Sequence, residues 1–305
     1  MGYRFKDHET VTDGIKRIAL EQLEKAIEQT KPGIRNPEEA IHDVRVSFKK
    51  LRALLRLARV KKNDDVFARE NACYRDAGRR LSEVRDATAM VSAFDKLTER
   101  YAEQLARDAF AELRKPFLKS KRKQHSDKNA ALSALARMLE SARSRVTDWP
   151  LEDDGFSALR QGLKRTYKHG RAGMAQALAE PKAESFHEWR KRVKDLWYQV
   201  RLLKPTWPAM LKDLADQLER LGDYLSDDHD LAILRHMVLQ QSPGDRTQLE
   251  ALVALIDQRR GELEVEAKRL GERIYGENPK AFVSRFEVYW HAWCAEAKID
   301  PIAVR

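Results

Sequence analysis

Apolar side chains recur at steps of three and four residues along most of the chain, a spacing that predicts long amphipathic helices. The pattern is clearest over residues 41–58, where the apolar positions of one helical face are Ile41, Val44, Phe48, Leu51, Leu55 and Ala58. The same spacing returns 145 residues later, at Phe186, Trp189, Val193, Leu196, Val200 and Leu203. Two long helices with matching buried faces are therefore expected.

A row of mostly basic residues lies one position further round each of these helices. The first row is His42, Arg45, Lys49, Arg52 and Arg56, and the second is His187, Arg190, Lys194, Trp197 and Arg201. Because an α-helix advances about 100° per residue, each row borders the apolar face and would point along a crevice between packed helices, where an extended anion fits. One such helix alone would indicate ordinary basic side chains at a core boundary, but the repeat in one register favours the crevice.

The order of landmarks along residues 8–147 repeats along residues 156–300. Gly14, Gly78, Leu81 and Asp86 are matched by Gly162, Gly222, Leu225 and Asp230. In the first half, helices are expected over about 14–29, 36–61, 65–84, 85–106 and 130–146, with a loop or frayed helix end over the basic stretch 115–128. The sequence therefore predicts an all-α fold in which a duplicated unit forms two antiparallel bundles of about four helices.

The composition agrees with long helices, since 35% of the 305 residues are charged and only 13 are Gly and 10 are Pro. No apolar run is long enough to span a membrane, and the N-terminus lacks a signal-peptide core. Cys73 and Cys294 are too few and too separated for a disulfide framework or a thiolate metal site. We expect a reduced, soluble protein of the cytoplasm.

The formal net charge of +10 is concentrated in three segments. Residues 41–62 hold eight Lys or Arg against one acidic residue, residues 112–128 hold seven against two, and residues 186–204 hold six against two. Concentrated positive charge attracts polyanions, although it does not specify which one.

The paired motifs resemble the CHAD domain, the conserved-histidine α-helical domain. The resemblance is carried by His42-Asp43-Val44-Arg45 with Lys49, by His187-Glu188-Trp189-Arg190 with Lys194, and by residues 81–86 and 225–230, each expected to form a Leu-Ser-x-x-x-Asp turn. It covers about residues 8–300, so the whole chain, 1–305, would be one CHAD domain. It implies two four-helix bundles related by a pseudo-twofold axis, with a basic cavity between them. Members of the family bind inorganic polyphosphate and associate with polyphosphate granules, without established catalysis.

Carried over position by position, the resemblance implies a polyphosphate site lined by thirteen side chains. They are His42, Arg45, Lys49, Arg52, Arg56, Lys164, Lys168, Arg171, His187, Arg190, Lys191, Lys194 and Arg201. Trp197 stands where the first helix has Arg52, so contact there is expected to be weaker or replaced by packing. The expected partners are inorganic polyphosphate and enzymes of polyphosphate metabolism, and no catalytic residue, cofactor or membrane is expected.

Other functions fit the sequence less well. A metal-dependent, phosphate-processing site could use Asp227-Asp228-His229-Asp230, but helix capping in a turn explains this cluster better. Residues 264–268 match the Glu-x-Glu-x-Lys signature of CYTH triphosphate hydrolases, which works on a strand, whereas a helix with a Glu264–Lys268 pair is expected here. Nucleic-acid binding stays open, because clustered Arg and Lys would also serve it.

Overall fold

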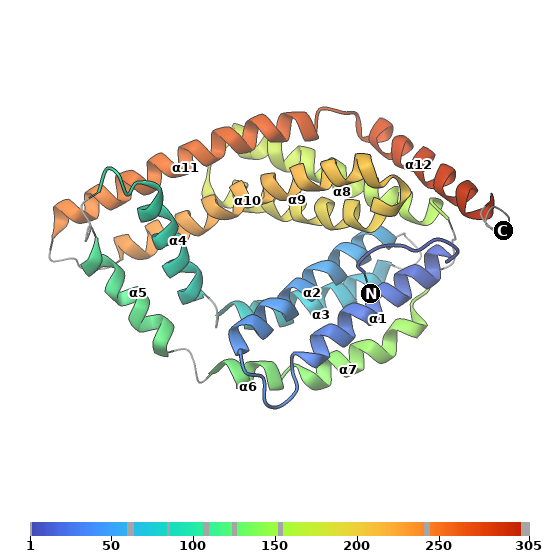
Figure 1. Cartoon of the computed structure of the whole chain (residues 1–305), viewed down its shortest axis with the longest axis horizontal. Helices are drawn as coiled ribbons and strands as arrows, with labels where there is room; N and C mark the ends of the chain where they lie inside the picture. The colour runs from blue at the N-terminus through green and yellow to red at the C-terminus, as the bar shows by residue number, and fades with distance from the viewer. Residues whose placement is uncertain are drawn as a thin grey trace, which may run out of the picture.

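The computed structural model describes residues 2–59, 64–83, 86–105, 110–123, 127–151, 155–240 and 245–299. All regular secondary structure in these ranges is helical, which confirms the all-α prediction (Figure 1). The α-helices are α1 (Val11–Glu28), α2 (Pro37–Ala58), α3 (Asp64–Glu83), α4 (Asp86–Arg100), α5 (Ala111–Lys123), α6 (Asp127–Ser133), α7 (Ala136–Arg145), α8 (Ser157–Ala179), α9 (Ala183–Leu203), α10 (Pro208–Leu239), α11 (Arg246–Ile274) and α12 (Pro279–Ile299). None of the described helices has the length and apolar character that crossing a bilayer requires.

Side-chain caps fix where several helices begin. Thr10 Oγ1 accepts a hydrogen bond from the backbone N–H of Asp13 at the start of α1, at 3.0 Å. Asn36 Oδ1 accepts from the N–H of Glu39 at 3.3 Å, and Pro37 is the first residue of α2, as the sequence predicts. Such contacts satisfy backbone donors that have no partner inside the helix, so a local sequence pattern sets these boundaries.

The helices enclose two hydrophobic cores. The main core joins α1, α2, α3, α8 and α9 to the first part of α10, the end of α11 and α12. A second core joins α4 and α5 to the far parts of α10 and α11, with Phe94, Phe117, Leu234 and Ile256 among its side chains. Thus α4, which precedes the expected boundary between halves, packs on α10 and α11, which follow it, and α5 packs on α4 (Figure 1).

Helix α10 continues through residues 225–230, where the sequence suggested a turn. The turn prediction for this segment was therefore wrong, as was the capping role given to residues 227–230. Asp228 is instead buried in mid-helix and accepts a hydrogen bond from Arg260 Nε of α11 at 2.8 Å. The buried positions Leu221, Leu225, Asp228 and Leu231 follow one another at steps of three and four residues, so the buried face continues through the segment, which favours a continuous helix.

The basic stretch 115–128 is helical where the structure describes it, so the expected loop is also corrected. Helix α5 extends to Lys123 with Pro116 inside it, and α6 begins at Asp127; residues 124–126 lie outside the described residues. The Lys128 side chain is only 3% exposed and forms an ion pair with Glu38 of α2 at 3.3 Å. This lysine therefore joins α6 to α2.

Helix α8 approaches the C-terminal end of α2 very closely at Gly162. A Cβ atom at this position would lie 1.9 Å from the carbonyl oxygen of Leu57. Beside it, Arg165 Nη2 donates to the carbonyl oxygens of Arg56 and Arg59, at 3.2 and 3.0 Å, and so satisfies acceptors that the end of α2 leaves open. Backbone packing at Gly162 thus fixes the position of α2.

We expect Gly162→Ala to lower the free energy of unfolding by on the order of 3 kcal/mol. The new Cβ would meet the backbone of Leu57, which cannot move aside as a flexible side chain would. The matched control is Gly261→Ala in α11, where an added Cβ meets no atom within 4 Å. The control should raise stability by up to about 1 kcal/mol through helix propensity. Urea denaturation of both variants decides the point, and equal effects would contradict the close approach.

Candidate functional site

Helices α2 and α9 pack against each other in antiparallel orientation. The buried side chain of Gln199 donates from Nε2 to the carbonyl oxygen of Ala53 at 3.2 Å. About one turn later in α2 and one turn earlier in α9, Arg56 Nη1 donates to Asp195 Oδ1 at 3.0 Å. The two basic rows found in the sequence therefore lie along the same contact.

A pocket of about 160 Å³ opens between α2 and α9 and is lined mainly by cations. Its lining residues are Lys49, Arg52, Arg56, Arg190, Lys191, Arg192, Lys194, Asp195 and Tyr198. Seven of these nine carry positive charge, and Asp195 is the one acidic residue among them. We call this site the α2–α9 pocket.

Asp195 compensates only part of the positive charge. Its carboxylate forms ion pairs with Arg56 at 3.0 Å and with Arg192 at 3.6 Å. Burial, followed by the repulsion of Arg56 and more weakly of Arg75 and Arg192, lowers the pKa of Arg52 to about 10. Burial is the main cause and the neighbouring guanidinium groups add to it, so an anion in the pocket would help to keep Arg52 charged.

Six of the thirteen predicted residues line the α2–α9 pocket: Lys49, Arg52, Arg56, Arg190, Lys191 and Lys194. The pocket is also lined by Arg192, Asp195 and Tyr198, which were not predicted because they lie off the basic row of α9. Arg192 and Asp195 lie three positions apart and form an ion pair, and this spacing was visible in the sequence. Arg75 of α3, whose charge lowers the pKa of Arg52, was also not predicted, because it lies on neither of the two helices that carry the basic rows.

The other predicted residues lie outside this lining. Arg45 donates to the carbonyl oxygen of Gly78 in α3 at 2.8 Å, much as Arg190 donates to Ser226 of α10 at 2.9 Å. The guanidinium of Arg201 stacks on Trp197, 4.6 Å from the ring centroid. The remaining predicted residues of α2 and α8 have exposed side chains: His42, Lys164, Lys168 and Arg171.

His187 lies in a neighbouring cavity of about 460 Å³ between α9 and α10, together with His229 and His236. The rings of His187 and His229 are 4.2 Å apart between centroids. Burial, followed by the charges of His187, Arg190 and Lys191, lowers the pKa of His229 from 6.5 to about 4. Burial and the charges of Arg190 and Lys191 also lower the pKa of His187. Both imidazoles are therefore neutral at pH 7.

The CHAD domain family model matches residues 17–239, which is most of the chain and includes both basic rows. The chain belongs to the CHAD domain family. The match begins within α1 and ends at the last residue of α10, so α11 and α12 lie beyond it. The α2–α9 pocket lies wholly within the matched part of the CHAD domain. A search of curated proteins found no match to this chain.

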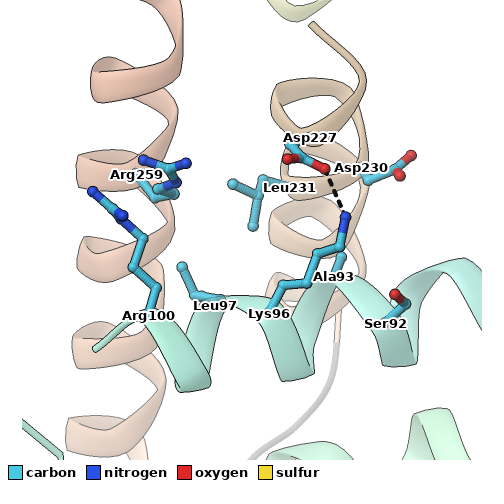
Figure 2. A pocket seen from close by; sticks show the side chains of 9 residues that line it. All are labelled: Ser92, Ala93, Lys96, Leu97, Arg100, Asp227, Asp230, Leu231 and Arg259. Atoms are coloured by element: carbon cyan, nitrogen blue, oxygen red, sulfur yellow. Dashed lines mark hydrogen bonds and ion pairs between the residues drawn. The ribbon is translucent and has the colours of Figure 1, made fainter. Parts of the chain in front are cut away.

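A second pocket, of about 200 Å³, lies between α4, α10 and α11 of the CHAD domain protein (Figure 2). Lys96 forms an ion pair with Asp227 at 3.0 Å, and Arg100 and Arg259 both contact Glu262, at 3.1 and 2.7 Å. Each of these three cations therefore has a carboxylate partner. These ion pairs attach α4 to α10 and α11.

The metal and hydrolase alternatives find little support in the described residues. Within those residues, no group of three or more His, Cys, Asp or Glu side chains is placed to hold a metal ion. The segment 264–268 lies inside α11, so the CYTH-like match is helical, as expected. Glu264 pairs with Arg260 at 3.3 Å, and not with Lys268 as the sequence suggested.

The paired histidines predict a dependence of stability on pH. The pKa of His229 is lower in the folded chain than in the unfolded chain, so below about pH 6.5 the unfolded chain binds a proton that the folded chain does not. The free energy of unfolding should therefore decrease as the pH falls from about 6.5 towards 4, and His229→Asn should reduce this decrease. Urea denaturation at pH 7.5, 5.5 and 4.5 measures it.

The matched control is His291→Asn, since His291 is exposed on α12. It should leave the pH dependence of the wild type in place. An equal reduction in both variants would show that the partly buried pair of His187 and His229 is not the source of the pH dependence.

Proposed function

We propose that this protein binds inorganic polyphosphate in the α2–α9 pocket and does not change it chemically. The observation that carries the proposal is the gathering of seven Lys and Arg side chains in the lining of one pocket, between two helices far apart in the sequence. Membership of the CHAD domain family is consistent with this ligand.

The chemistry of the pocket suits a polyphosphate chain. Polyphosphate carries a regular series of negative charges and no bases, so recognition needs cations and no base-specific donors. Arg side chains can hold two phosphate oxygens at once, while Lys acts as a mobile point charge. Several such contacts release many counterions together, which makes binding sensitive to salt.

The proposal includes the finer organisation of the fold. In it, α2 and α9 are the equivalent helices of a duplicated unit, with halves over about 8–147 and 156–300 and a basic cavity between them. The antiparallel contact of α2 and α9 supports this, because a twofold axis through their contact relates the helices in that way. Binding would allow association with polyphosphate granules or with enzymes of polyphosphate metabolism.

The test compares long-chain polyphosphate with single-stranded DNA of equal total charge in a salt series. The pocket variant replaces three cations by Gln, at Lys49, Arg52 and Lys191. We expect polyphosphate to bind the wild type more tightly than DNA at each salt concentration, and the variant to lose that preference. The plot of log K against log salt has a negative slope, and its magnitude should decrease by about 2 in the variant, because three fewer phosphates are neutralised.

The matched control removes the same charge from exposed lysines elsewhere, at Lys212, Lys268 and Lys280. It should keep most of the affinity and the preference for polyphosphate. A third variant, with Gln at Lys164, Lys168 and Arg171, tests whether the site extends along α8. Equal losses in the pocket variant and the lysine control, or equal binding of DNA by the wild type, would contradict the proposal.

A further inference from the structure

Lys194 differs from the other cations of the α2–α9 pocket in how its side chain is held. Its ammonium nitrogen lies 5.2 Å from the ring centroid of Trp197, within the range of a cation–π contact. The same ring carries the guanidinium of Arg201 at 4.6 Å. Trp197 is itself fixed, because it packs partly buried against the main core. The aromatic ring therefore contacts two cations at once.

Gly222 of α10 supplies the space through which the end of Lys194 passes. A Cβ atom on Gly222 would lie 2.8 Å from Cε and 2.9 Å from Nζ of Lys194. Gly222 is buried in the middle of a 32-residue helix, where glycine destabilises the helix relative to alanine. At the equivalent position of the first half, Gly78, an added Cβ would meet only Phe48, at 3.8 Å. The close approach of a cation is therefore particular to Gly222.

A third contact completes the placement of the ammonium group. Lys194 Nζ forms an ion pair with Asp223 Oδ1 at 3.1 Å. Asp223 is 64% exposed, whereas Lys194 is 25% exposed. An ion pair with so exposed a carboxylate is weak and screened by salt, so a phosphate in the pocket can compete with it.

We propose that Trp197 and Gly222 are positioning residues that hold the Lys194 ammonium at the α2–α9 pocket before the polyanion binds. A long Lys side chain normally loses much rotamer freedom when it binds a ligand, and a side chain already confined loses less. In this view Trp197, where the first row has Arg52, is more than a missing anion contact, because its ring holds two neighbouring cations. The inference rests on the proposed function.

The first test is a series at Trp197, measured by calorimetric titration with long-chain polyphosphate at several salt concentrations. Trp197→Leu keeps an apolar side chain without a π face and should weaken binding roughly 2- to 5-fold. Its salt slope should not change, because the number of cations is the same. Trp197→Phe should restore most of the affinity, and Trp197→Arg should not exceed the wild type.

The second test uses Gly222→Ala, which displaces only the flexible end of Lys194. The variant should be at least as stable as the wild type, since alanine favours the helix, and yet bind polyphosphate more weakly. A merely structural role of Gly222 would instead make stability and binding change in the same direction.

A double-mutant cycle with Lys194→Gln separates positioning from general disturbance. If Trp197 and Gly222 act through Lys194, adding either substitution to Lys194→Gln should cause little further loss of affinity. Full additivity, or a gain of affinity and salt slope in Trp197→Arg, would overturn the inference. A wild type that fails to bind polyphosphate would instead overturn the proposed function, so the two failures are distinguishable.

Discussion

The antiparallel contact between α2 and α9 is the interaction on which the arrangement of basic side chains depends. Both helices bury apolar faces in the main core, and the fully buried Gln199 joins them through the backbone of Ala53. Helix α8 holds the C-terminal end of α2 through the close approach at Gly162. With the backbones fixed in this way, the edge of each apolar face, where the basic row lies, meets the edge of the other.

Bringing like charges together opposes folding, and the apolar burial around the α2–α9 pocket offsets that cost. Asp195 compensates Arg56 and Arg192, while the pKa of Arg52 is lowered by burial and by its cationic neighbours. A site of this kind holds unfavourable electrostatic energy that a polyanion can relieve, so the same geometry that costs stability favours binding.

In the pocket between α4, α10 and α11, ion pairs join helices to one another. There each of three cations contacts a carboxylate, and the charges connect α4 to its neighbours across the second core. Lys128 and Glu38 join α6 to α2 in a similar way. Ion pairs of Lys and Arg between separate helices therefore help to hold α4 and α6 in place.

The sequence alone determined what depends on near neighbours along the chain. Helical periodicity predicted the all-α fold and the buried faces of α2 and α9, and Asn36 with Pro37 predicted where α2 begins. Five side chains of the two rows share one pocket, because a row on a helix edge stays on that edge wherever the helix packs. The placement of α4 on α10 and α11, the position of His187 in a second cavity and the addition of Arg192 were decided by the tertiary structure. Those features depend on which helices meet and at what height, and contacts between residues about 40 to 146 positions apart set both.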